Sequence, residues 1–178
     1  LHDVGKPACK STDEDGVDHF YGHPAVSAQL ADQMLQTLKF NTKTREQVTS
    51  LVEHHDVQIL CQERSIRRWL NRLGTEAFFQ LLEVKRADNM GQNYELVKGR
   101  LALLDEIKAK AEEIILQKQC VSLKDLAVNG LDVTAAGVSQ GPAVGRVLNV
   151  LLEKVLSGEF PNEREALLSL IPAIAQNF

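Results

Sequence analysis

The amino-acid sequence predicts an all-α protein made of two helical parts. Apolar residues recur at the three- and four-residue spacing of a helix along the whole chain, whereas the strict alternation of a β-strand is nearly absent. The composition changes after Gln119, where glycines and small residues become frequent. We therefore expect a larger helical domain over residues 1–119 and a smaller helical tail domain over residues 120–178.

The first domain is expected to begin with a loop rich in Gly, Asp and Pro over residues 3–22. Pro24 suits the first turn of a helix, and its apolar face includes Ala31 and Leu35. Thr44 and Gln47 form a capping-box pattern that predicts the start of the next helix. Three more helices follow, over residues 65–73, over residues 75–89 and along an apolar stripe from Val97 to Ile115.

The tail is expected to begin with short turns and to end with two helices. Pro142 predicts the start of a helix that Gly158 ends, and Asn162 is expected to cap the final helix. In the turns before Pro142, four apolar residues are expected to be available for burial: Leu123, Leu126, Val128 and Leu131.

The composition restricts the possible partners and the compartment. The chain has 178 residues, 44% of them hydrophobic, and a net charge of −4, which argues against a generally basic surface for nucleic acid. The longest apolar runs are shorter than the roughly 20 residues that a membrane span needs. Cys9, Cys61 and Cys120 are widely spaced and form no CxxC pair, as expected of reduced thiols in a cytoplasmic protein.

Two ionisable side chains are predicted to face the interior of the first domain. On a helical projection, His55 falls on the same side as Val52, whereas His54 points in another direction. Asp88 follows Leu81 by seven residues, so this carboxylate also lies on an apolar face. An unpaired buried carboxylate is unfavourable by several kcal/mol, so Asp88 should have a cationic partner or a metal ion.

Further histidines and a carboxylate extend this set of candidate ligands. His2 and Asp3 are adjacent, and His23 lies where the loop is expected to meet a helix. Nitrogen and carboxylate ligands without thiolates suit a divalent ion such as Mg, Mn, Fe, Ni or Zn. Lys6 follows closely and is a candidate for contact with a phosphate. Each histidine taken singly could instead be a core or capping residue, and this is our interpretation of His19 and His54.

These segments resemble a known superfamily. The motifs are HD followed by GKP at the start, HFYGHP.VSA at residues 19–28, HHD at 54–56 and RAD at 86–88. They are similar to the HD superfamily of metal-dependent phosphohydrolases. LKF at 38–40, and DLAVNGLDV followed by GPAVGRVLNVLLEKVLSGEFPN within 125–162, resemble bacterial CCA-adding tRNA nucleotidyltransferases of the poly(A) polymerase family. The resemblance implies an HD-type helical bundle followed by a smaller helical tail.

The resemblance also implies roles for individual residues. The metal ligands would be His2, Asp3, His23, His55 and Asp88, and the catalytic groups Asp3, Lys6 and His55. A bound ion would activate water to hydrolyse a 2′,3′-cyclic phosphate or a phosphomonoester. The family's first ligand is a histidine upstream of the HD pair, so we expect the chain to be the C-terminal part of a longer enzyme with weakened metal binding. We also expect no nucleotidyl transfer by these residues alone, because the Gly-Ser pair and paired aspartates of the family's head domain are missing.

The partner implied by the resemblance is tRNA. Arg64, Arg67, Arg68 and Arg72 recur at three- and four-residue spacing around Trp69 and are candidates for contact with tRNA phosphates. The alternative is a solvated helix face with a core tryptophan. Three functions therefore remain open: a phosphohydrolase module, an RNA-binding scaffold with a structural HD cluster, and a free-standing HD phosphohydrolase acting on a nucleotide.

Overall fold

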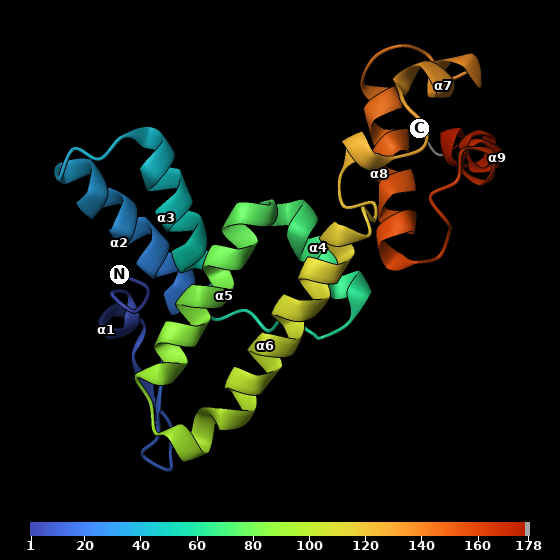
Figure 1. The fold of residues 1–178 in the computed structure, drawn as a ribbon. Helices are drawn as coiled ribbons and strands as arrows, with labels where there is room; N and C mark the ends of the chain where they lie inside the picture. Colours follow the sequence, from blue (N-terminus) through green and yellow to red (C-terminus); the bar gives the residue numbers. More distant parts are fainter. Residues whose placement is uncertain (177–178) are drawn as a thin grey trace. The chain divides into compact units, whose positions relative to one another are not determined.

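The computed structural model describes residues 1–176, and the regular structure of this part of the chain is predominantly helical (Figure 1). It contains nine α-helices, a short 3-10 helix η1 and one two-stranded hairpin, so the predicted all-α class is confirmed. Among the described residues, no helix combines the length and the apolar character that crossing a bilayer would require. The backbone contacts divide the chain into two compact units.

The limits of these units differ from the predicted domain limits. The first unit is Leu1–Gln58 with Thr75–Leu104, and the second is Ile59–Gly74 with the residues from Asp105 onward. The long helix α6 (Tyr94–Leu116) supplies residues to both units. The domains 1–119 and 120–178 therefore remain a prediction.

The first unit consists of a short N-terminal segment and a set of longer helices. The predicted loop over residues 3–22 contains regular structure, namely α1 (Lys6–Cys9) and a hairpin of β1 (Ser11–Thr12) and β2 (Asp18–His19). The longer helices are α2 (His23–Thr37), α3 (Thr42–His54), α5 (Thr75–Met90) and the first part of α6. Helices α2 and α3 lie side by side as a helical hairpin, α1 packs on α2, and α5 packs on α3 (Figure 1).

The N-terminal segment is held closely against the start of α2. The Gly5 N–H donates a hydrogen bond to the Ser27 hydroxyl, with a distance of 2.9 Å. A Cβ atom at Gly5 would come within 2.7 Å of the Ser27 backbone nitrogen, so a larger residue would push the segment away from α2. This contact places the turn that contains His2 and Asp3 beside the N-terminus of α2.

The start of α3 differs from the prediction. Asn41 is the N-cap, and its side-chain oxygen accepts a hydrogen bond from the Thr44 N–H at 2.9 Å. The predicted capping box of Thr44 and Gln47 is therefore wrong, because Thr44 already lies within the helix that Asn41 caps.

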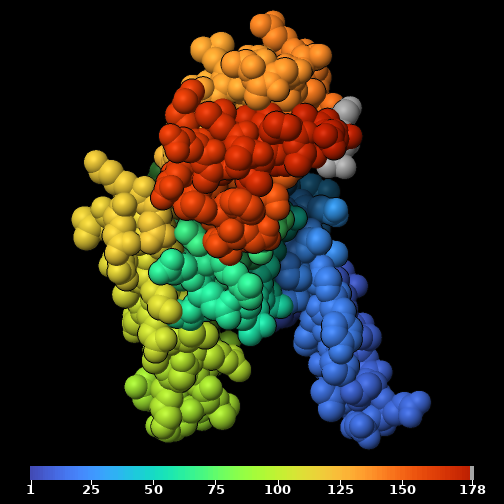
Figure 2. Space-filling model, turned by 90° about the vertical axis from the view of Figure 1, so that its right-hand side faces the viewer, coloured from blue at the N-terminus to red at the C-terminus, as the bar shows by residue number. Residues whose placement is uncertain are grey.

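The second unit is organised around α8 (Pro142–Ser157). Helix α8 contacts α4 (Glu63–Leu73), η1 (Leu123–Asp125), α7 (Gly130–Ala135) and α9 (Arg164–Ala175). Its apolar face supplies buried side chains that meet those of α9, including Val147, Leu151, Leu167 and Ile171. Figure 2 shows the red C-terminal residues packed against the orange segment that contains α7. The predicted limits of α8 are confirmed, because Pro142 begins the helix and Gly158 ends it at a φ of 79°.

Two predictions for the tail are wrong. Glu163, and not Asn162, is the N-cap of α9. The Asn162 side chain instead accepts a hydrogen bond from the Ala127 N–H and donates one to the Asp125 carbonyl, so it ties the turns to the start of α9. Among the four leucine and valine residues expected to be available for burial, Val128 is buried, but Leu123 and Leu131 are 43% and 78% exposed. Leu131 lies in the first turn of α7, on a side of this short helix that the described residues leave open.

Candidate functional site

Five side chains from separate segments of the first unit converge. His23 Nε2 and His55 Nε2 lie 3.3 and 3.5 Å from Asp3 Oδ1, and the two imidazole nitrogens are 3.2 Å apart. His2 Nε2 lies 3.5 Å from Asp3 Oδ2 and 3.3 Å from Asp88 Oδ1. The ligand atoms therefore form two groups that share Asp3, each with separations below 4.8 Å. We call these five residues the His-Asp cluster.

The positions of these residues at the ends of helices explain their convergence. His2 and Asp3 lie in the turn before α1, His23 is the first residue of α2, and His55 is the C-cap of α3. Asp88 lies in the last turn of α5. A carbonyl in the last turn of α3 orients the His55 ring, and the carbonyl of Phe20, which precedes α2, orients the His23 ring.

The hydrogen bonds of the two buried histidines fix the direction of their lone pairs. His23 Nδ1 lies 2.9 Å from the Phe20 carbonyl, and His55 Nδ1 lies 2.7 Å from the Val52 carbonyl. A carbonyl can only accept, so both Nδ1 atoms carry hydrogen, and either ring in its neutral form presents an Nε2 lone pair to the cluster.

These lone pairs meet an oxygen that also lacks a donor. Asp3 Oδ1 is buried and has no hydrogen-bond partner, although both Nε2 atoms lie close to it. Three acceptors facing one another repel unless a cation lies among them. The donor set therefore fits a divalent metal ion, with histidines oriented through Nδ1 as is usual for metal ligands. A proton shared by the two imidazoles is the alternative.

The electrostatic environment keeps two of these groups in the forms that bind metals. Burial would raise the pKa of Asp3, but the hydrogen bond and charge of Lys6, with smaller contributions from His2 and His55, hold that pKa below its ordinary value. Burial lowers the pKa of His55, and the neighbouring His2 and His23 add to this effect. Asp3 is therefore a carboxylate and His55 a neutral imidazole at neutral pH.

Lys6 also lies beside the cluster. Its ammonium is 2.6 Å from Asp3 Oδ2 and 5.9 Å from the centre of the Phe20 ring. The predicted contact of Lys6 with a phosphate is compatible with this position, because 38% of the side chain remains exposed.

The other two histidines lie outside the cluster. His19 Nε2 contacts Asp13 Oδ2 at 2.7 Å within the hairpin segment. His54 is buried and its Nδ1 lies 2.8 Å from the Ser50 carbonyl, which agrees with its interpretation as a core or capping residue. It can point in another direction than His55 and still be buried, because α3 is covered on two sides, by α2 and by α5.

Lys85 is a residue of the site that the sequence analysis missed. Its ammonium donates to the carbonyls of His55 and Val57, both at 2.7 Å. Burial lowers the pKa of Lys85, and the nearby Asp56 and Asp88 oppose this effect. The only signal in the sequence is its position one helical turn before Asp88, which places both side chains on the same side of α5.

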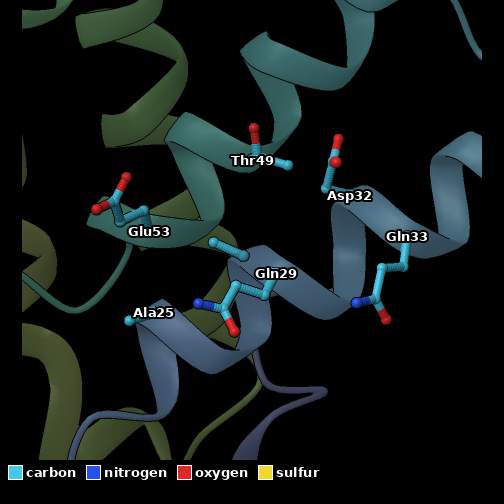
Figure 3. A pocket seen from close by; sticks show the side chains of 7 residues that line it. Ala25, Gln29, Asp32, Gln33, Thr49 and Glu53 are labelled. Atoms are coloured by element: carbon cyan, nitrogen blue, oxygen red, sulfur yellow. The ribbon is translucent and has the colours of Figure 1, made fainter.

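A groove of about 420 Å³ lies between α2 and α3 but contains no member of the cluster (Figure 3). Its lining residues are Ala25, Ala28, Gln29, Asp32, Gln33, Thr49 and Glu53. Two of its polar groups already have partners. Arg45 donates to both oxygens of Asp32 at 2.8 and 2.7 Å, and the Thr49 hydroxyl donates to the Arg45 carbonyl. The remaining polar side chains of the lining are Gln29, Gln33 and Glu53.

The four arginines predicted to bind RNA lie on α4 but do not form one free surface. Arg68 is ion-paired with Glu153 of α8, and the buried Nε of Arg67 has no partner. The Arg72 guanidinium lies 5.4 Å from the centre of the Trp69 ring. Arg64 and Arg72 are exposed and make no ion pair within the described part of the chain. Two of the four predicted residues are thus available in this unit for a phosphate.

Comparison with known proteins identifies the family. The family model for tRNA nucleotidyltransferase domain 2 matches residues 24–171. The A-adding tRNA nucleotidyltransferase of Deinococcus radiodurans is 31% identical over 179 residues, covering 93% of this chain and 38% of that protein. The CC-adding tRNA nucleotidyltransferase of Thermus thermophilus is 30% identical, covering 93% and 37%. The CCA-adding enzyme of Levilactobacillus brevis is 25% identical, covering 84% and 38%.

The family match begins at residue 24, directly after His23, and it includes His55, Asp88 and most of the tail. The chain spans less than two fifths of the length of these curated relatives. No solved structure matches it. Because the family match and the similarity to these relatives extend over most of its length, the chain belongs to the tRNA nucleotidyltransferase family.

Proposed function

We propose that this chain is the HD-type helical part of a CCA-adding tRNA nucleotidyltransferase, and that its His-Asp cluster binds a divalent metal ion and hydrolyses a phosphate ester. One observation carries the proposal: Asp3 Oδ1, His23 Nε2 and His55 Nε2 converge within 3.5 Å, and the buried Asp3 Oδ1 accepts no hydrogen bond. His2 and Asp88 lie beside this group and complete the proposed ligand set.

The proposed chemistry divides between the ion and the chain. A divalent ion at such a site lowers the pKa of bound water and polarises a phosphoryl oxygen. Lys6 contributes a positive charge next to Asp3, where it can contact a phosphate oxygen of the substrate. Asp3 Oδ2 is the proposed acceptor for the proton of the attacking water, because this carboxylate is deprotonated at neutral pH, whereas the Nε2 lone pair of His55 would be taken up by the ion.

The proposal also includes contact with tRNA, the substrate named for the relatives. Arg64 and Arg72 are the candidate phosphate contacts, since Arg67 donates to the Gln119 side chain at 3.4 Å and Arg68 is paired with Glu153. The sequence holds no Gly-Ser pair, so nucleotidyl transfer by these residues is not part of the proposal. The proposal includes the predicted cytoplasmic location, because tRNA is the proposed partner.

The alternative of a free-standing phosphohydrolase acting on a nucleotide is less well supported. The family match continues through the tail to residue 171, and such an enzyme would not need that segment. The alternative of a purely structural cluster makes a different prediction, because it requires no metal ion.

Elemental analysis and a hydrolysis assay test the proposal. Protein purified without chelator should contain a divalent metal, and it should hydrolyse a 2′,3′-cyclic nucleotide or p-nitrophenyl phosphate after loading with Mn²⁺. His55→Gln should lose both metal and activity, whereas the matched control His19→Gln, outside the cluster, should keep them. A parent protein that binds no divalent metal would show that the cluster is structural.

A further inference from the structure

Lys85 is hydrogen-bonded to two backbone carbonyls although two carboxylates lie near it. Asp56 and Asp88 are close enough to influence its charge, yet within the described residues Lys85 forms an ion pair with neither. Its ammonium instead donates to the carbonyls of His55 and Val57, at 2.7 Å each. The side chain is partly buried, so these two bonds replace contacts with water.

The two carbonyls belong to the C-cap of α3 and to the chain that follows it. The last four carbonyls of an α-helix have no partner within the helix, and the chain that follows is free to change direction. Helix α3 ends at His54, and His55 is its C-cap. A donor from another helix that binds the His55 and Val57 carbonyls therefore fixes the backbone on which the His55 imidazole is mounted.

Lys85 is also linked to the other side of the cluster. It precedes Asp88 by three residues on α5, so the two side chains leave the same side of the helix. Asp88 Oδ1 lies 3.3 Å from His2 Nε2. One turn of α5 thus carries both an anchor for the backbone of His55 and a carboxylate of the cluster.

A lysine that only stabilised the end of a helix would act equally well from within α3 itself. Lys85 reaches α3 from α5, and it binds the carbonyl of a residue whose imidazole faces Asp3 at 3.5 Å. We propose that Lys85 is a positioning residue, which holds His55 and Asp88 at the separation that metal binding requires. This inference rests on the proposed function of the cluster.

The test compares three variants of the whole chain after treatment with chelator. Lys85→Met removes the donor and keeps the length of the side chain, Lys85→Arg restores a donor, and Lys43→Met is the control. Lys43 is an exposed lysine in the first turn of α3, remote from its C-terminus. Mn²⁺ affinity is measured by titration calorimetry, and hydrogen exchange of residues 52–58 by mass spectrometry.

We expect Lys85→Met to weaken Mn²⁺ binding about 10- to 100-fold, as is typical when a supporting contact of a metal ligand is removed. Exchange should become faster in residues 52–58 and not elsewhere. Lys85→Arg should recover most of the affinity, and Lys43→Met should match the parent. If Lys85→Met does not fold, Lys85→Gln takes its place, with Lys85→Arg as the rescue.

Two results would overturn the inference and are distinguishable. A parent protein that does not bind Mn²⁺ removes the proposed function and this inference with it. A parent that binds Mn²⁺ while Lys85→Met binds equally well leaves the metal site in place and rejects the role of Lys85. A loss of affinity accompanied by faster exchange along the whole chain would also reject it, because it would indicate general destabilisation.

Discussion

Replacing Asp3 by Asn is expected to abolish metal binding without destabilising the metal-free protein. Asp3 Oδ1 faces His23 Nε2 and His55 Nε2 at 3.3 and 3.5 Å and accepts no hydrogen bond. Asn has nearly the same shape, and its amide can donate to one of these nitrogens while its oxygen still accepts from Lys6. The substitution therefore relieves a repulsion in the metal-free state but removes the negative charge that a metal ion requires.

The structure sets the sizes of both effects. A new neutral hydrogen bond contributes about 0.5–1.5 kcal/mol to stability. The lost charge of the partly exposed pair with Lys6 removes roughly 0–1 kcal/mol. The stability of the metal-free variant should thus change by between about −0.5 and about +1.5 kcal/mol, with a small gain as the central value, and for a chain of this size its melting temperature should change by between roughly −2 and roughly +6 °C. In contrast, the parent at a metal concentration of 100 times Kd should gain about 2.7 kcal/mol, or roughly 5–10 °C.

Differential scanning calorimetry with EDTA and then with excess Mn²⁺ measures both effects on the same samples. The matched control is Asp13→Asn, which alters another carboxylate paired with a histidine, since Asp13 Oδ2 lies 2.7 Å from His19 Nε2. The control should keep the full response to Mn²⁺. The reasoning fails if Asp3→Asn lowers the melting temperature in EDTA by several degrees and the parent shows no response to Mn²⁺, since Asp3 would then act as an ordinary structural residue.

Three other expectations concern pH, the tail and tRNA. Folding lowers the pKa of His55 from 6.5, so on acidification the unfolded state of the protein takes up a proton at this residue before the folded state does. The contribution of His55 to the stability of the metal-free protein should therefore be complete above pH 6.5 and decline as the pH falls below that value. Urea midpoints as a function of pH test this, and His55→Gln should lack the decline. Leu151 is fully buried, so Leu151→Ala should lower the free energy of unfolding by about 2–5 kcal/mol in urea titrations, and a loss below 1 kcal/mol would contradict the packing of α8. Replacing both Arg64 and Arg72 by Gln should weaken tRNA binding and reduce the slope of log affinity against log salt by about 1.4–1.8, and an unchanged slope would move the tRNA contacts elsewhere.

The sequence by itself determined the helical class and most of the helix limits. Pro142 and Gly158 mark the two ends of α8 because they act on their own backbone, through a fixed φ and through a left-handed conformation. The inward position of His55 followed from helical periodicity, which is also a local property. The sequence placed a cap wrongly at Thr44 and at Asn162, because several polar residues near each helix start can serve and the surrounding structure selects one.

Only the tertiary structure decided which of the predicted residues meet. His23 and His55 are 32 residues apart, and the 3.2 Å between their Nε2 atoms depends on how α2 packs against α3. The same holds for Lys85, whose bonds to the His55 and Val57 carbonyls cross from α5 to α3. Packing also decides which arginines of α4 are available for a phosphate, because Arg68 forms an ion pair with Glu153 of α8 while Arg64 stays exposed. Periodicity reports the direction of a side chain from its own helix, whereas the partner it finds depends on contacts between segments distant in the sequence.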